Sequence, residues 1–416
     1  MIYLDYAATT PLSLAALAAM QPYFSNMFAN PASLHSGGRA ANAALEKART
    51  TLACCVNAES PSTITITGGG TDGSNLVIAG LAQRWEADTD PSDCHILVSA
   101  IEHEAVLNPA LALHKRGWQL TVLPVTPTGH VSVDALERAL QQSLHQPNAQ
   151  KTLVSIMHAN NEVGSLQPIQ ALASLAHQYG AVFHTDAVQT VGKIPVDVQQ
   201  LGVDYLTWSA HKHYGPKGVG ALYTAGGALT PAPLLLGGGQ ENGLRSGTVN
   251  VAGAVGVATA LEECVAAQPK SFARLEMLTQ HLRDGLESLL CPCPLVINTP
   301  ADDSIPGIVH VSVLGNSFPI QGESLLLQLD LLGIAASSGS ACHAVALEPS
   351  RILHAMMVGE NSDRALTSEE LARATGTIRF SMGHHTTQQD VDALLAAFPK
   401  ALNRLMKTAP TMSGVH

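Results

Sequence analysis

Short apolar, β-branched runs alternate with longer amphipathic stretches between about residues 60 and 225. Between the runs, apolar residues recur at helical spacing in SNLVIAGLAQRWEA, AVLNPALALHKRG, VDALERALQQSLHQ and PIQALASLAHQYG. A repeating strand–helix–strand order is typical of a mostly parallel sheet with helices on both faces, so the sequence predicts an α/β fold. The expected strands are 62–67, 94–100, 118–125, 152–158, 181–187, 203–210 and 218–224.

The rhythm changes after residue 225. A glycine-rich loop precedes VAGAVGVATALEECV, a predicted long helix, and strands are predicted again in LVINT, GIVHVSVL and GIAASS, with helices after them. This order indicates a second, smaller α+β domain. We therefore expect a large domain at 13–256 and a small domain made of 1–12 and 257–416.

Composition and charge exclude several classes of protein. Apolar residues make up 46% of the chain and charged residues 13%, which is typical of a compact globular protein. The net charge is −11 and the 22 Lys and Arg residues are scattered, so nucleic acid is not expected as the main ligand. The start MIYLDYAATTPLS lacks the features of a secretion signal, and no apolar run approaches twenty residues. We expect a cytoplasmic protein that does not bind membranes.

The seven cysteines are too few for a disulfide scaffold. Neither Cys-x-x-Cys nor His-Glu-x-x-His occurs, so no metal site is expected. Cys54 and Cys55 close an alanine-rich helical pattern and are expected to be buried. Cys342 differs, because the small residues of SSGSAC are typical of an exposed, flexible loop in which a thiol is accessible.

Polar side chains follow the predicted strands where each strand ends. After 62–67, GGGTDGSN leads into a helix, and such a turn is a plausible seat for a phosphate. Taken singly, each residue has an ordinary structural role; Asp186 could cap a helix and Lys212 could be a solvated cation. The carboxyl ends of parallel strands meet at one edge of a sheet, so we expect one site there. Its members are His103, Asn160, Asn161, Asp186, Gln189, His211 and Lys212.

This set of groups matches the needs of pyridoxal 5'-phosphate. The cofactor requires an amine for a Schiff base, for which Lys212 is the candidate, and a carboxylate near the pyridine nitrogen, for which Asp186 fits. Asn161 and Gln189 could donate to the ring's phenolic oxygen. The sequence therefore predicts a pyridoxal phosphate enzyme.

Long motifs then make the chain recognisable. It resembles the cysteine desulfurases of the class V aminotransferase family, which feed iron–sulfur cluster assembly, and among them the group with a longer, mobile catalytic loop. The resemblance runs from residue 3 to residue 387 and implies fold type I of the pyridoxal phosphate-dependent transferases. It rests on YLDYAATTP, NPASLHSGGR, TGGGTDGSN, EHEAVL, NNEVG, HTDAVQTVGKIPVD, SAHKHYGPKGVGALY, GGGQENGLRSGT, SSGSAC, LEPS and IRFS.

The resemblance implies roles for residues around the cofactor ring. Lys212 would form the Schiff base, and Asp186 would pair with the pyridinium nitrogen. His103 would stack on the ring and help to move protons. Asn161 and Gln189 would contact the phenolic oxygen, and Asn161 would also lie near the substrate.

The resemblance also assigns the phosphate, the substrate carboxylate and the nucleophile. Thr248 would reach the phosphate of the neighbouring subunit, so that the enzyme is a homodimer, and Arg379 would bind the carboxylate of L-cysteine. Cys342 would take the sulfur as a persulfide, release L-alanine, and pass the sulfur to an acceptor such as an iron–sulfur scaffold or a relay protein. The phosphate would be held in its own subunit by Gly70, Thr71, Ser209 and His211.

Three other functions stay open at this point. A cysteine, cystine or selenocysteine lyase would use the same cofactor without an obligatory persulfide, a simple aminotransferase would not need Cys342, and an interaction protein could keep the fold without catalysis. The chain also departs from the family pattern at His213, at His343 and in the longer stretch Leu347–Ile378. These departures bear on acceptor choice and loop motion, and they leave the core chemistry intact.

Overall fold

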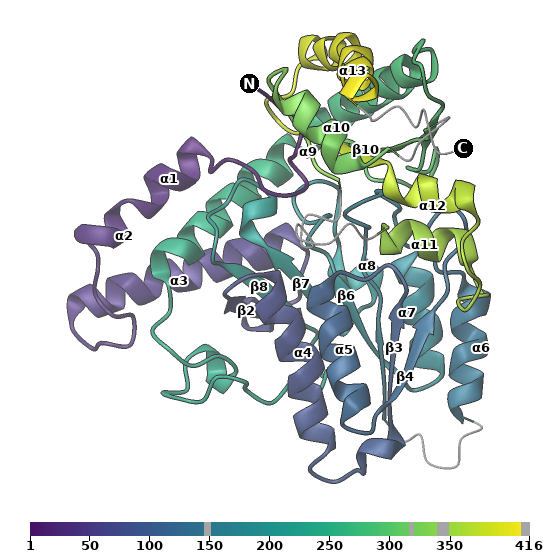
Figure 1. Cartoon of the computed structure of the whole chain (residues 1–416). Helices are drawn as coiled ribbons and strands as arrows, with labels where there is room; N and C mark the ends of the chain where they lie inside the picture. The colour runs from purple at the N-terminus through teal and green to yellow at the C-terminus, as the bar shows by residue number, and fades with distance from the viewer. Residues whose placement is uncertain (145–150, 316–319, 339–348, 409–416) are drawn as a thin grey trace.

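The computed structural model describes residues 1–144, 151–315, 320–338 and 349–408. A seven-stranded sheet forms the centre of the larger part of the molecule (Figure 1). All seven strands expected between residues 62 and 224 belong to it, and β8 runs in the opposite direction to the other six. The strand order is β2 (Ile64–Thr67), β8 (Gly220–Thr224), β7 (Tyr205–Ser209), β6 (Val182–Asp186), β5 (Lys151–Ser155), β3 (Cys94–Ser99) and β4 (Gln119–Leu123).

Helices cover both faces of this sheet, as the alternating pattern predicts. Within β3, Ile96 and Val98 pack into one apolar cluster, while Leu97 packs into the other. The first cluster includes α4 (Gly70–Trp85) and α5 (Glu104–Lys115). The second includes α3 (Ser36–Cys55), α6 (Val133–Leu144), α7 (Ile169–Gln178) and part of α9 (Val251–Glu287). Since both faces are covered, the central strands are buried along their whole length.

A smaller antiparallel sheet has its own apolar cluster. Its strands are β9 (Leu295–Ile297), β10 (Ile308–Val313) and β12 (Thr377–Ser381), with β10 in the middle. The cluster joins this sheet to the second half of α9, to α10 (Gly322–Asp330) and to α13 (Gln388–Thr408). The N-terminal β1 (Ile2–Tyr3) pairs in parallel with β11 (Ile334–Ala335) on the same side (Figure 1). The predicted α/β fold class is confirmed, whereas the domain limits at residues 12 and 256 stay a prediction.

Helix α9 is longer than its apolar start predicts, because it continues for 37 residues through Pro269. By length and composition alone it could cross a membrane, yet 56% of its most apolar window is buried inside the protein, as in a core helix. It packs against α1 (Leu14–Met20), α2 (Pro22–Ser25) and α3.

The expectation that Cys54 is buried is wrong, because its side chain is exposed and that of Cys55 is half-buried. The buried stripe of α3 runs through Ala48 and Leu52, and a residue two positions beyond Leu52 lies on another face of the helix.

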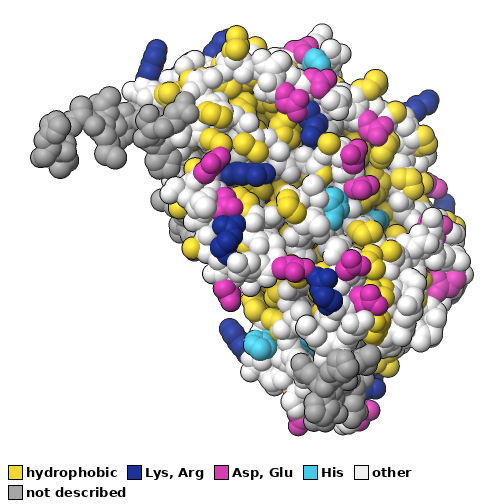
Figure 2. All heavy atoms as spheres, turned by 90° about the vertical axis from the view of Figure 1, so that its right-hand side faces the viewer, with side chains coloured by type: hydrophobic (Ala, Val, Ile, Leu, Met, Phe, Trp, Pro, Cys, Tyr) yellow, Lys and Arg dark blue, Asp and Glu magenta, His cyan; other side chains and the backbone are white. Residues whose placement is uncertain are grey.

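The described part of the stretch that was expected to be longer than in the family begins at residue 349 and holds two helices, α11 (Arg351–Val358) and α12 (Ser368–Thr375). A short helix, α8 (Val198–Leu201), lies between β6 and β7. Ile352, Leu353 and Met356 of α11 are buried in the large apolar cluster, so this stretch is an integral part of the fold. On the side of the molecule seen in Figure 2, Lys and Arg are interspersed with Asp and Glu.

Candidate active site

A cavity of about 780 Å³ opens where the strands of the large sheet end. Ten of the thirteen predicted site residues line it, and they come from both sheets. Asn160 does not line the cavity; it is buried, and its Oδ1 accepts from the Glu162 and Val163 N–H groups. Thr248 does not line the cavity. It is exposed just before α9, and its expected contact is with the phosphate of a neighbouring subunit. Cys342 lies outside the described residues. The ten that meet at the cavity are Gly70, Thr71, His103, Asn161, Asp186, Gln189, Ser209, His211, Lys212 and Arg379.

The phosphate seat predicted after β2 is the start of helix α4. Gly69, at the N-cap with φ of 142°, has no side chain to bond the first N–H groups of the helix, so these can bind an anion. A Cβ on Gly70 would lie 2.6 Å from Val188 Cγ2, so glycine lets the turn approach the loop after β6. Asp72 fixes the turn by accepting from the Gly68 N–H at 2.6 Å and from Arg245 Nε at 2.8 Å.

Asp186 is the last residue of β6 and is buried. Its Oδ1 accepts from the Val188 N–H at 2.9 Å, so part of its role is to shape the turn, as an ordinary structural aspartate would. Burial raises the pKa of Asp186, while the Val188 N–H and the nearby His103 and Lys212 oppose that rise. A buried carboxylate at a cavity wall can pair with a protonated ring nitrogen.

His103 caps the N-terminus of α5. Its Nδ1 accepts from the Ala105 N–H at 3.0 Å. A nitrogen that accepts a hydrogen bond carries no proton, so the neutral imidazole holds its proton on Nε2. The same contact fixes the ring at the cavity wall.

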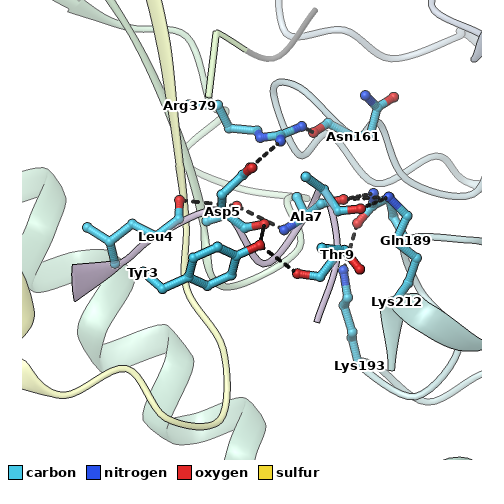
Figure 3. Close-up of polar contacts among 12 residues, drawn as sticks. Tyr3, Leu4, Asp5, Ala7, Thr9, Asn161, Gln189, Lys193, Lys212 and Arg379 are labelled. Carbon is cyan, nitrogen blue, oxygen red and sulfur yellow. Dashed lines mark hydrogen bonds and ion pairs between the residues drawn. The ribbon is translucent and has the colours of Figure 1, made fainter. Parts of the chain in front are cut away.

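The N-terminal segment closes over the turn that carries Lys212 (Figure 3). Lys212 Nζ donates to the carbonyl oxygens of Ala7 at 2.7 Å and Ala8 at 2.8 Å. Gln189 Nε2 also donates to the Ala7 oxygen, at 3.0 Å, and His211 Nδ1 lies 3.1 Å from Thr9 Oγ1. The start of the chain thus organises three predicted cofactor residues, Lys212 and Gln189 through backbone carbonyls and His211 through the Thr9 hydroxyl.

Arg379 brings the small sheet to the cavity. It lies on β12 and is 2% exposed. Its two terminal nitrogens donate to the Asn161 carbonyl oxygen at 2.7 Å and to Asp5 Oδ1 at 2.8 Å. Within the described ranges its Nε has no hydrogen-bond partner. A buried, pre-oriented guanidinium of this kind suits the binding of a carboxylate.

Sequence reasoning missed several groups at this site. Glu102 is fully buried beside His103 in EHEAV; its Oε1 accepts from Ser99 Oγ at 2.5 Å and from the Met157 N–H at 2.8 Å. Burial raises the pKa of Glu102 to about 8. Arg351 donates to two backbone carbonyls at the cavity rim, including that of Glu102. The sequence could have indicated both residues, because Glu102 lies in the motif EHEAVL and Arg351 directly follows LEPS.

Two further residues were missed although their motifs were recognised. Asp5 lies in YLDYAATTP and pairs with Arg379, and Lys193 lies in HTDAVQTVGKIPVD and contacts Gln189. Nothing in these motifs indicates that Asp5 pairs with Arg379 or that Lys193 contacts Gln189.

An α/β fold with a lysine, a buried aspartate and a helix-start anion site in one cavity defines a class of cofactor-dependent enzyme. The sequence model of the aminotransferase class-V family matches residues 2–394, so the chain belongs to that family. The predicted resemblance is thereby confirmed at the level of the family.

The relatives narrow the assignment to the cysteine desulfurases. A cysteine desulfurase IscS from Dictyoglomus turgidum is 41% identical over 98% of this chain and 96% of its own length. Cysteine desulfurase IscS 1 from Archaeoglobus fulgidus is 37% identical over 99% of both chains.

Solved structures agree with these relatives. A NifS-like protein superposes with a TM-score of 0.83 at 35% identity, over 97% of this chain and 99% of that chain. A structure described as SspA in complex with cysteine has a TM-score of 0.74 at 32% identity, over 93% of this chain and 100% of the other. Fold type I and the prediction of a cysteine desulfurase are both confirmed.

Proposed function

We propose that this chain is a cysteine desulfurase that removes sulfur from L-cysteine with pyridoxal 5'-phosphate, releases L-alanine and takes the sulfur as a persulfide on Cys342. One observation carries the proposal: Lys212, Asp186, His103 and Arg379 line one cavity. The chain is also 41% identical, along almost its whole length, to a protein named cysteine desulfurase.

The residues at the cavity fit the cofactor. The uncapped start of α4, with Ser209 and His211, would hold its phosphate, and Lys212 would bind it covalently. Asp186 would pair with its ring nitrogen, and Asn161 and Gln189 would donate to its ring oxygen. When bound, pyridoxal phosphate supplies an electron sink for the charge that develops at the substrate α-carbon.

The protein groups then divide the work of binding and proton transfer. Arg379 binds the substrate carboxylate, and the amine of Lys212 takes the proton from the α-carbon. His103, with its proton on Nε2, donates and recovers protons near the ring.

Sulfur transfer completes the reaction. The Cys342 thiolate attacks the sulfur of the substrate, and the S–S bond forms as the C–S bond breaks. Protonation of the remaining three-carbon product at its β-carbon, and return of a proton to its α-carbon, would give L-alanine. The persulfide on Cys342 then passes its outer sulfur to an acceptor protein, either an iron–sulfur scaffold or a relay protein.

The proposal includes a cytoplasmic homodimer in which Thr248 reaches the phosphate site of the neighbouring subunit. Large apolar side chains support the dimer, because they are exposed on α1 and α2, in the loop between α2 and α3 and in the loop after β8, and an exposed apolar patch marks an interaction surface. They include Leu14, Phe24, Phe28, Leu34 and Leu236.

A peptide map by mass spectrometry, after brief anaerobic exposure of the enzyme to L-cysteine, tests the proposal. We expect one additional sulfur on the Cys342 peptide of the wild-type enzyme, with alanine in the supernatant, and neither in Cys342→Ala. Pyruvate and sulfide from both proteins would instead identify a lyase. The absence of any product, from a colourless protein, would identify a non-catalytic interaction protein.

A further inference from the structure

Lys193 lies behind the predicted cofactor site and contacts one of its members. Lys193 Nζ donates to Gln189 Oε1 at 2.6 Å, while Gln189 Nε2 donates to the Ala7 carbonyl oxygen at 3.0 Å (Figure 3). Gln189 lines the large cavity. Lys193 does not; it lines a separate small cavity on the other side, with Tyr6 and Thr10. The lysine therefore acts on the site only through its neighbours.

These two contacts fix the orientation of the Gln189 amide. The Lys193 amine donates to Oε1, which places the amide oxygen toward the lysine, and a backbone carbonyl can only accept, so the amide nitrogen must face Ala7. Both partners require the same orientation, and Gln189 is only 4% exposed. One N–H of Nε2 bonds Ala7, and the second remains for a ligand in the cavity.

We propose that Lys193 is a positioning residue that holds the Gln189 amide with its NH₂ group toward the ring oxygen of the cofactor. This inference rests on the proposed function, because it takes that oxygen as the ligand of Gln189. With the amide reversed, its carbonyl oxygen would face an anionic oxygen, and a stabilising hydrogen bond would become a repulsion.

The surroundings of Lys193 support a functional role for the residue. Burial lowers the pKa of Lys193 to about 7, and the charges of Lys212 and Arg379 act in the same direction, against a weaker opposite influence from Cys264. In the described part of the chain, no carboxylate forms an ion pair with it. A cation placed close to two others is expected where its contact serves the site.

The test measures the absorption of the bound cofactor in the holoenzyme without substrate, as a function of pH. An N–H that donates to the ring oxygen stabilises the negative charge on that oxygen. The oxygen then attracts the proton of the Lys212–cofactor linkage less strongly. Without that donor, the midpoint pH of the spectral change should rise. We expect Lys193→Met to raise it by about one pH unit, and Lys193→Arg, which keeps a cation that only donates, to restore most of the shift.

Two further variants show whether the effect passes through the amide. Gln189→Glu keeps the contact with Lys193 but loses the N–H donor, so its midpoint should also rise, even if Lys193→Met fails to fold. In a Gln189→Leu background, Lys193→Met should produce no additional shift. An equal shift in both backgrounds, or none in either, would overturn the inference. A wild-type protein without any cofactor band would overturn the proposed function itself.

Discussion

The buried ion pair between Arg49 and Glu241 allows a stability prediction with a defined magnitude. Arg49 on α3 is 8% exposed, and Glu241, in the loop between β8 and α9, is 9% exposed. The two terminal nitrogens of Arg49 donate to the two carboxylate oxygens at 2.8 and 2.9 Å, and the Ile66 N–H of β2 donates to the same carboxylate at 2.7 Å. Glu241→Ala removes the acceptor of a buried cation and of a buried N–H together.

The expected loss of unfolding free energy follows from this geometry. Removal of one partner of a buried ion pair costs about 3–5 kcal/mol, because a charge stays buried without compensation. Arg49 keeps two contacts, to the Ile64 carbonyl oxygen at 2.5 Å and, through Nε, to the exposed carboxylate of Glu46 at 3.4 Å, and both limit the loss. The matched control is the pair of Arg138 and Glu360, whose side chains are 53% and 73% exposed. Glu360→Ala should cost about 0–1 kcal/mol.

Urea unfolding at fixed protein and cofactor concentrations measures both variants, since bound cofactor and association also change apparent stability. The midpoint of Glu241→Ala should fall several times further than that of Glu360→Ala. The double variant Arg49→Met/Glu241→Ala should recover part of the loss, because it leaves no buried charge. Equal, small shifts for the two single variants would refute the reasoning.

Three other substitutions test groups at the cavity. Asp186→Asn should lower kcat by about 10²-fold or more, because the ring nitrogen loses its ionic partner; steady-state alanine formation measures this, and an unchanged kcat would contradict the role. Arg379→Lys should raise the KM for L-cysteine by about 10- to 100-fold through loss of the guanidinium fork, and an unaltered KM would assign the carboxylate elsewhere. Glu102, with a pKa raised from 4.5 to about 8, keeps a proton in the native state that the unfolded chain loses. Unfolding free energy should therefore fall as pH rises from 4.5 to 8, by up to about 1.4 kcal/mol per pH unit, and Glu102→Gln should lack that slope; parallel pH profiles of wild type and variant would refute this.

The sequence predicted most of the large sheet because its strands carry a local signal. Each of the seven is a short apolar run next to a helical pattern, and the rule that ligands bind at the carboxyl ends of parallel strands placed their polar neighbours together. The pairing of β1 with β11 carried no such signal, since each strand has only two residues. The full extent of α9 was not predicted either, since the helix continues beyond the apolar stretch VAGAVGVATALEECV, through Pro269, to Glu287.

The missed site residues share a different cause. Asp5 and Arg379 are 374 positions apart, and no pattern within either motif indicates that they meet. Lys193 is close to Gln189 in sequence, but the orientation of the Gln189 amide depends also on Ala7, which contacts the amide nitrogen and is 182 positions away. Contacts of this kind depend on tertiary structure and escape any reading of local periodicity.

The N-terminal segment ties Arg379, the proposed substrate-binding arginine, to Lys212, the proposed catalytic lysine. Asp5 pairs with Arg379 of the small sheet, and two residues later Ala7 and Ala8 accept hydrogen bonds from Lys212 of the large-sheet side (Figure 3). Tyr3 braces this turn, because its hydroxyl donates to the Asp5 and Thr9 carbonyl oxygens at 3.1 and 3.0 Å. A displacement of the backbone of residues 5–8 would therefore move Arg379 and Lys212 together. The spacing between substrate and catalytic amine is thus set by one short, braced turn as well as by the packing of the two sheets.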